Sequence, residues 1–382
     1  MQLKQVSLSL ALASSATAQS LTDALNSQNS SLSVLNGLLA SNPTILSALN
    51  NAQNVTFLAP NNDALNGVIN GSVNTYGGSV NTYGGSVKDP SWVANLLNYH
   101  VIKGAYQSSA FTDKPVFPHT LLNNQSYTNV TDGQVVQVQK KDGKVVAYSG
   151  LKYYSTVKTA DVNYTGGVIH IIDRVLILPQ NDTNTMTQSN LTALSGAVKA
   201  ANMGPQLDGM KDVTIFAPDN NAFVSISSLL ANMSATDVGK ILGYHVVPGT
   251  VAYSSMLKNS TIKASDGTDL KITVEDGGAV FVNAARVTVP NILVGNGVVH
   301  VVNQVLNPDN TSQAPDPSAT TPPTPAFNGG SSPAAAADVP TPTGGGAPAA
   351  TASGPINAAG PMKTGAVGAA ALFGGAALLI NW

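Results

Sequence analysis

The sequence predicts an α+β fold that is present twice in the chain, and three pairs of matching segments carry this prediction. The first landmark is a short apolar run that ends in Ala-Pro and is followed by Asx residues. The second is a Tyr-His pair, and the third is a glycine followed by alternating aliphatic residues and a histidine. Landmarks that recur in the same order indicate a duplicated domain. They lie at 55–65, 97–101 and 166–176 in the first copy, and at 213–223, 242–246 and 296–306 in the second.

The first landmark is predicted to form a strand, a sharp exit and a capped helix. Val55 to Leu58 and Val213 to Phe216 are apolar and β-rich, which is typical of buried strands. The Ala-Pro that follows ends the strand, because proline cannot donate to a sheet hydrogen bond. Asx side chains in this position can accept hydrogen bonds from the first N–H groups of a helix. The candidates are Asn61, Asn62 and Asp63 in the first copy and Asp219, Asn220 and Asn221 in the second.

In each copy, the remaining patterns place helices before strands. Apolar residues at helical spacing predict helices over 21–25, 31–40, 44–49, 90–97, 191–201 and 236–242. Closing strands are expected over 168–176 and 298–306. Asp-Gly pairs at 142–143, 266–267 and 276–277 predict hairpin turns between alternating segments. Helices followed by strands are typical of an α+β arrangement.

These landmarks resemble those of the fasciclin (FAS1) domain family. The resemblance covers residues 19–178 and 185–308, and it implies two tandem domains, each with N-terminal helices packed on a β-wedge of short strands. The first copy departs from the family pattern at Leu65, where phenylalanine is usual. The low charge and the apolar C-terminal signal resemble those of fungal surface proteins of this family.

The composition excludes several classes of function. Only 10% of the 382 residues are charged and the formal net charge is −2. No basic patch is present, which excludes nucleic acid as a partner. The absence of cysteine excludes disulfides, thiolate metal ligands and cysteine nucleophiles. A surface with so few charges needs another source of solubility, and sugars are the expected one.

Both ends of the chain carry targeting patterns. Residues 1–18 are predicted to be a signal peptide that is cleaved after Ala18. Residues 309–357 are rich in Pro, Ala, Thr and Gly and are predicted to be a disordered, O-glycosylated stalk. Residues 358–382 have the pattern of a GPI-attachment propeptide, with Asn357 as the attachment site and Ser353 or Gly354 as second choices. A retained tail anchor is the alternative.

The first copy also contains a seven-residue repeat, Gly-Ser-Val-Asn-Thr-Tyr-Gly, that begins at Gly71 and again at Gly78. The second copy lacks it. A tandem insertion in a surface loop is one interpretation, because loops tolerate added residues. An adhesive loop that uses Tyr76 and Tyr83 is the other.

Known catalytic patterns do not occur in the sequence. It contains no G-x-S-x-G and no H-E-x-x-H, and no glycine-rich loop with a phosphate-binding lysine. Four of the five histidines belong to the duplicated landmarks. We therefore predict no enzymatic activity, no cofactor and no metal site. His170 and His300 lie among alternating apolar residues and are expected to be structural.

The Tyr-His pairs allow two interpretations. Each histidine can be a buried residue that is hydrogen-bonded to backbone where a helix meets a strand. The family resemblance implies the second interpretation, since this region of animal members has been linked to integrin adhesion. It marks Tyr99, His100, Tyr244 and His245 as adhesion candidates.

Many N-x-S/T sequons indicate N-glycosylation, if the chain is secreted and the sites are exposed. Asn54 is not expected to be used, because it adjoins a buried strand. The candidates are Asn29, Asn70, Asn124, Asn129, Asn163, Asn181, Asn190, Asn232, Asn259 and Asn310.

Together these patterns predict a cell-surface adhesion glycoprotein that binds neighbouring cells, matrix or wall non-covalently. The expected partners are surface or wall glycans or proteins, including a second copy of the chain. Two linked modules allow weak sites to reinforce one another. One alternative is a wall-organising protein that binds polysaccharide without bridging cells. A carbohydrate-active enzyme is less favoured, because no convincing carboxylate pair occurs.

Overall fold

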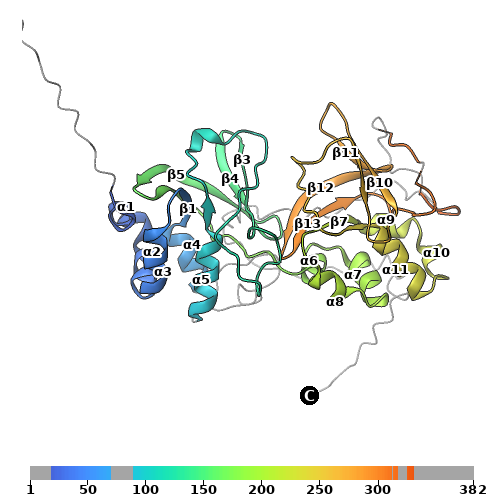
Figure 1. Cartoon of the computed structure of the whole chain (residues 1–382), viewed down its shortest axis with the longest axis horizontal. Helices are drawn as coiled ribbons and strands as arrows, with labels where there is room; N and C mark the ends of the chain where they lie inside the picture. Colours follow the sequence, from blue (N-terminus) through green and yellow to red (C-terminus); the bar gives the residue numbers. More distant parts are fainter. Residues whose placement is uncertain (1–18, 70–88, 312, 317–324, 331–382) are drawn as a thin grey trace, which may run out of the picture.

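A computed structural model describes residues 19–69, 89–311, 313–316 and 325–330. These residues form two α+β domains side by side, the first in blue to green and the second in yellow-green to orange (Figure 1). The duplicated α+β fold is as the sequence predicts. The signal peptide, the Tyr76 and Tyr83 repeat, Asn70, the Asn357 anchor and most of the stalk lie outside the described residues.

Domain 1 places five helices and a short 3₁₀ turn around one sheet, within the part of the chain described. The helices are α1 (Leu21–Ser27), α2 (Asn29–Ala40), α3 (Pro43–Asn51), α4 (Asn62–Ile69), α5 (Pro90–Tyr99) and η2 (Ser108–Ala110). The strands are β1 (Val55–Pro60), β2 (Val101–Lys103), β3 (Gln137–Lys141), β4 (Lys144–Tyr148), β5 (Tyr154–Tyr164) and β6 (Gly167–Ile172).

Domain 2 repeats this order. Its helices are α6 (Asp182–Gln188), α7 (Thr192–Ala200), α8 (Gly204–Gly209), α9 (Asn220–Val224), α10 (Ser227–Leu230) and α11 (Ala235–Tyr244). Its strands are β7 (Val213–Pro218), β8 (Val246–Val247), β9 (Ser260–Lys263), β10 (Asp269–Val274), β11 (Val280–Val282), β12 (Ala285–Val294) and β13 (Gly297–Val302). The first helix begins at Asp182, slightly before the expected domain start at 185.

The two sheets share one strand order, to which domain 2 adds the edge strand β9. Their strand orders are β2-β1-β6-β5-β4-β3 and β8-β7-β13-β12-β11-β10-β9. One pair is parallel in each sheet, β1 with β6 and β7 with β13, whereas the pairs on either side of it are antiparallel. The first and third sequence landmarks are therefore hydrogen-bonded neighbours, as the second and third strands from the β2 or β8 edge of each sheet.

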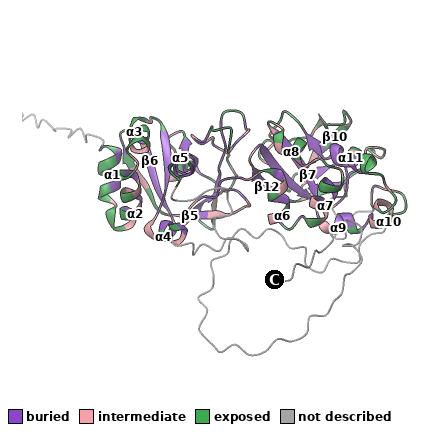
Figure 2. Cartoon of the chain, turned by 90° about the horizontal axis from the view of Figure 1, so that it is seen from below, coloured by how far each residue is buried: buried purple, intermediate pink, exposed green. Residues whose placement is uncertain are grey.

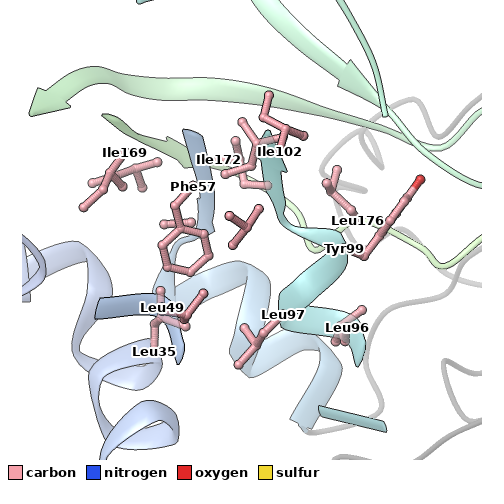
Figure 3. Packing of buried hydrophobic residues seen from close by; sticks show 14 of the residues in the cluster. Leu35, Leu49, Phe57, Leu96, Leu97, Tyr99, Ile102, Ile169, Ile172 and Leu176 are labelled. Atoms are coloured by element: carbon pink, nitrogen blue, oxygen red, sulfur yellow. The ribbon is translucent and has the colours of Figure 1, made fainter. Parts of the chain in front are cut away.

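Buried leucines join the helices to the sheet of domain 1. Figure 3 shows Leu35 and Leu49 facing Phe57 of β1, with Ile169 and Ile172 on the neighbouring strand. Leu35 and Phe57 are 0% and 1% exposed. In Figure 2 the buried strands lie inside, and the outer helices are exposed on their outward faces. Apolar burial of this kind contributes most of the driving force for folding.

The Asx residues after Ala-Pro have two separate tasks. Asn61 Oδ1 accepts from the N–H of Ala64 at 2.9 Å, which confirms the predicted cap. The next residue, Asn62, reaches back to an earlier helix and accepts from the N–H of Val34 at 2.9 Å. Domain 2 makes the same two contacts with Asp219 to Ala222 and Asn220 to Ala193. The motif thus fixes both the new helix and the helix packed beside it.

Part of the predicted stalk packs on domain 2, and this corrects the expectation of disorder from residue 309. Ala326 is 6% exposed, and Phe327 packs against the core of domain 2. The side-chain amides of Asn307 and Asn310 both donate to the carbonyl of Ala326. The described residues 325–330 therefore belong to the packed unit of domain 2, because Ala326 and Phe327 bury apolar surface there.

The two domains contact one another through a small apolar cluster. The rings of Phe117 in domain 1 and Tyr253 in domain 2 are stacked, with centroids 4.3 Å apart and planes at 9°. Val135 of domain 1 and Leu293 of domain 2 are buried in the same cluster. Gly150 and Leu293 also form an isolated parallel β-bridge across the junction.

Hydrogen bonds surround this apolar cluster. The N–H of Asn129 donates to the carbonyl of Gly295 at 2.7 Å, and its side-chain amide donates to the carbonyl of Met210 at 2.9 Å. The fully buried side chain of Gln134 donates to the carbonyl of Val294 at 3.0 Å. These hydrogen bonds and the apolar cluster cross the boundary together, so the two domains form one packed unit.

Tyr253→Ala is expected to uncouple the two domains. It removes a large buried ring, which costs about 3 kcal/mol for a core aromatic. Small-angle scattering should show a larger radius of gyration, and calorimetry should separate two thermal transitions. Met256→Ala, on the same loop but 60% exposed, is the control and should leave both measurements unchanged. A compact, singly melting Tyr253→Ala protein would contradict the interface.

Candidate functional site

Each histidine of the Tyr-His pairs joins a helix end to the segment after the closing strand. His100 Nδ1–H donates to the carbonyl of Leu96 at 2.7 Å, and Nε2 accepts from the N–H of Leu176 at 2.8 Å. His245 makes the same bonds to Ile241 and Leu306, both at 2.8 Å. Because one ring nitrogen donates and the other accepts, each imidazole must be neutral. Burial lowers the pKa of each imidazole to about 4, although the bond to the helix carbonyl opposes this shift.

The two tyrosines are also internal. Tyr99 and Tyr244 are 0% exposed. Tyr99 Oη donates to the carbonyl of Val135 at 3.1 Å, and Tyr244 Oη donates to the carbonyl of Asp269 at 2.8 Å. Figure 3 shows Tyr99 at the end of α5, beside Leu176. Burial raises the pKa of both phenols.

The structure therefore does not place the four adhesion candidates where a partner could touch them. Tyr99, His100, Tyr244 and His245 are each at most 1% exposed. Their polar atoms are used to hold backbone groups within each domain. This geometry agrees with the structural interpretation, and it corrects the expectation that these side chains present an adhesive surface.

The second pair of histidines is structural as well. His170 Nε2–H donates to the carbonyl of Tyr106 at 2.9 Å, and its Nδ1 accepts from the N–H of Asp161 at 3.2 Å. His300 repeats this with Ala252 at 2.9 Å and Asn291 at 3.4 Å. The His170 ring thus links the loop after β2 to strand β5. The His300 ring links the loop after β8 to strand β12 in the same way.

Two cavities lie at the junction of the domains, and residues 125–132 of domain 1 contribute to the lining of both. One has a volume of about 430 Å³ and is lined mainly by amides and hydroxyls from 125–129, 178–181 and domain 2. The other has a volume of about 760 Å³, and Phe117, Tyr253 and the exposed Met256 line it. Sequence reasoning missed both cavities, because their lining residues come from both copies and are brought together only by the packing of the two domains.

The described residues assemble no set of three or more His, Asp or Glu side chains suited to a metal ion. No single helix within the described ranges is long and apolar enough to cross a membrane. The pair α2 and α3, bent by 113°, passes that test together by length and composition alone.

The sequons divide by what their amide nitrogen does. Within the described chain, four candidates are exposed and donate no hydrogen bond from Nδ2; they are Asn29, Asn124, Asn190 and Asn259. In five others Nδ2 donates to a protein oxygen; they are Asn129, Asn163, Asn181, Asn232 and Asn310. Asn54 is exposed, contrary to the expectation drawn from the adjoining strand.

Glycopeptide mass spectrometry of the secreted protein should find glycans on Asn29, Asn124, Asn190 and Asn259. Asn129 should be unmodified, because its Nδ2 faces the carbonyls of Met210 and Gly209 at 2.9 and 3.4 Å inside the domain junction. A glycan there would have to displace domain 2. Substantial occupancy of Asn129 would therefore contradict the packing of the two domains.

Comparison with known proteins identifies the domains. The fasciclin domain family matches residues 30–179 and 189–308. A fasciclin-like arabinogalactan protein of Arthroderma benhamiae is 39% identical over 296 residues, which cover 78% of this chain and 68% of that protein. The fasciclin-like arabinogalactan protein elcF of Phaeosphaeria nodorum is 30% identical, over 76% of this chain and 90% of that protein.

A solved FAS1 domain pair from the insect cell adhesion molecule fasciclin I covers 75% of this chain and 99% of its own, with 19% identity and a TM-score of 0.35. The family matches fall on the two α+β units described above, and they include all three duplicated landmarks. The chain therefore belongs to the fasciclin family and carries two FAS1 domains in tandem.

Proposed function

We propose that the protein is a cell-surface adhesion glycoprotein that binds neighbouring cells, matrix or wall non-covalently through its two FAS1 domains. The observation that carries this proposal is the packing of the two copies into one unit, with cavities at their junction. A packed pair presents both surfaces in a fixed relation, which favours simultaneous engagement of an extended partner. The similarity to arabinogalactan proteins supports a glycosylated surface.

In this proposal the protein is not an enzyme and reaches the surface by its N-terminal signal. The C-terminal segment after Asn357 directs GPI attachment, at the plasma membrane or from there to a wall. The proline-rich segment beyond residue 330 holds the pair away from that attachment point. Wall organisation by polysaccharide binding, without bridging of cells, is the second candidate, and the amide-lined cavity favours it.

Cell aggregation and retention on isolated walls should be compared between cells that produce the chain and cells that lack it. The proposal predicts weaker aggregation or retention without the chain, and inhibition by added soluble residues 19–330. Equal adhesion with and without the chain would contradict it. Retention on walls without aggregation of cells would select the wall-organising candidate.

A further inference from the structure

The cavity of about 430 Å³, here called the junction cavity, exists only where three parts of the chain meet. Domain 1 contributes 125–129, the connection between the domains contributes 178–181, and domain 2 contributes residues that include Asn184, Asp208 and Asn296. Its volume lies in the range of small-molecule sites, about 300–1,000 Å³. A ligand here would therefore recognise the packed pair and neither domain alone.

The lining of the junction cavity is polar and almost neutral. It consists largely of amides and hydroxyls, with one carboxylate, Asp208, and no Lys or Arg. Both carboxylate oxygens of Asp208 are already engaged, by the N–H of Thr183 at 3.0 Å and by Asn181 Nδ2 at 2.9 Å. The groups that are left both donate and accept hydrogen bonds, as sugar hydroxyls do. The half-buried ring of Tyr127 adds an apolar surface.

Two buried polar atoms of this lining have no hydrogen-bond partner. They are the donor Gln180 Nε2 and the acceptor Asn296 Oδ1. A buried donor or acceptor without a partner is unfavourable, because nothing replaces the hydrogen bond it would make to water. Asn296 is 2% exposed and is held in place, because its Nδ2 donates to Asp182 Oδ2 at 2.9 Å and to the carbonyl of Leu207 at 2.8 Å. Its remaining oxygen is thus fixed and unused.

The duplicated domain shows that the fold does not require these polar residues. Gly166 occupies the position of Asn296: its carbonyl accepts from the N–H of Val55, as that of Asn296 accepts from the N–H of Val213. Leu21, the first residue of α1, is buried where α6 begins with the buried Asp182. Domain 1 therefore has a glycine at one of these positions and a leucine at the other. Only domain 2, which lines the junction cavity, has polar side chains there.

We propose that the junction cavity binds a short segment of a neutral oligosaccharide. Asn296 and Gln180 satisfy their unused atoms on sugar hydroxyls, while Gln125 and Asn184 contact the segment from the cavity wall. Asp182 acts as a positioning residue, because it orients Asn296. This inference rests on the proposed function and names the ligand class of the adhesive pair.

The test uses the full secreted chain and calorimetric titration with neutral hexasaccharides of β-1,3-glucose, chitin and α-mannose, and with hexagalacturonate. Gln125→Ala/Asn184→Ala removes two side chains that make no hydrogen bond within the described chain. Asn51→Ala/Gln53→Ala, a pair of exposed amides on domain 1, is the matched control. At least one neutral probe should bind, at least tenfold more weakly to the cavity variant and unchanged to the control.

Titration before and after enzymatic removal of N-glycans separates two sources of the sugar. Binding to both forms indicates an external glycan, whereas binding only after removal indicates that a glycan of the chain itself fills the site; both support the proposal. No binding of any neutral probe to either form, equal affinity for hexagalacturonate, or unchanged affinity in the cavity variant would overturn it. If the cavity variant still adheres to walls like the parent chain, the junction site fails but the adhesive function stands.

Discussion

Gly297→Ala is expected to prevent domain 2 from folding, and Gly167→Ala is expected to do the same to domain 1. A Cβ atom at Gly297 would lie 1.8 Å from the carbonyl oxygen of Val213, and one at Gly167 would lie 1.8 Å from that of Val55. These oxygens belong to the paired strands β7 and β1, so neither can move without breaking the parallel pair. The expected cost exceeds about 4 kcal/mol, among the largest for a single substitution.

Circular dichroism and denaturant unfolding of the two glycine variants would measure this loss. Gly37→Ala is the matched control. Gly37 lies inside α2, and its added Cβ would meet no atom within 4 Å. That change should stabilise domain 1 by up to about 1 kcal/mol, because alanine is the better helix former. A Gly297→Ala protein with the parent midpoint would contradict the described strand pairing.

His245→Ala is expected to lower the free energy of unfolding of domain 2 by about 3 kcal/mol or more. It leaves the buried N–H of Leu306 and the carbonyl of Ile241 without their partner and opens a cavity. His100→Ala should have the equivalent effect in domain 1 through Leu96 and Leu176. Thermal unfolding measures the loss. Unchanged stability combined with lost adhesion would restore the adhesive interpretation of the Tyr-His pairs.

The same variant should change how stability depends on pH. The pKa of His245 is about 4 in the folded protein and about 6.5 when unfolded. The unfolded state therefore binds the extra proton, and stability falls as the pH drops from about 6.5 to about 4. Each such histidine contributes about 3 kcal/mol over that range, and His100 and His300 share the direction.

The titration of Asp182 changes stability with pH in the opposite direction. Burial raises its pKa to about 7, so the folded state keeps the proton longer, and stability falls as the pH rises from about 4 to about 7.

Unfolding by urea at a series of pH values tests the His245 prediction. Between about pH 6.5 and 4, the free energy of unfolding should fall less steeply with decreasing pH for His245→Ala than for the parent chain. His119→Ala is the control, because that ring is partly exposed and bonds only within its own loop region. An unchanged slope would show that His245 is not the buried neutral group described above.

Local patterns predicted most of each domain. The Ala-Pro-Asx landmark was sufficient for the strand, its end and the cap on Asn61, because these depend on neighbouring residues. The second task of Asn62, a bond to α2, could not be read from the sequence because its partner lies 28 residues away. The closing strands end at Ile172 and Val302, earlier than predicted, since the following residues bond to the Tyr-His histidines.

The domain interface was beyond sequence reasoning for a different reason. Tyr253 follows Ala252, whose carbonyl meets His300, just as Gln107 follows Tyr106, whose carbonyl meets His170. One copy therefore has a surface amide where the other has an interface aromatic. Differences between matching positions of the two copies, such as this pair or Leu21 and Asp182, are the signal that could have marked the junction.

The central claim is that the packed pair of FAS1 domains binds by itself and non-covalently. The most direct measurement is the retention of soluble, glycosylated residues 19–330 on isolated walls and on a polysaccharide panel, with self-association measured by sedimentation on the same preparation. We predict saturable binding to a wall glycan or to a second copy, reversed by competitor without cleavage of any bond. Retention of the full chain but not of residues 19–330 would contradict the claim, because adhesion would then reside in the stalk or its anchor.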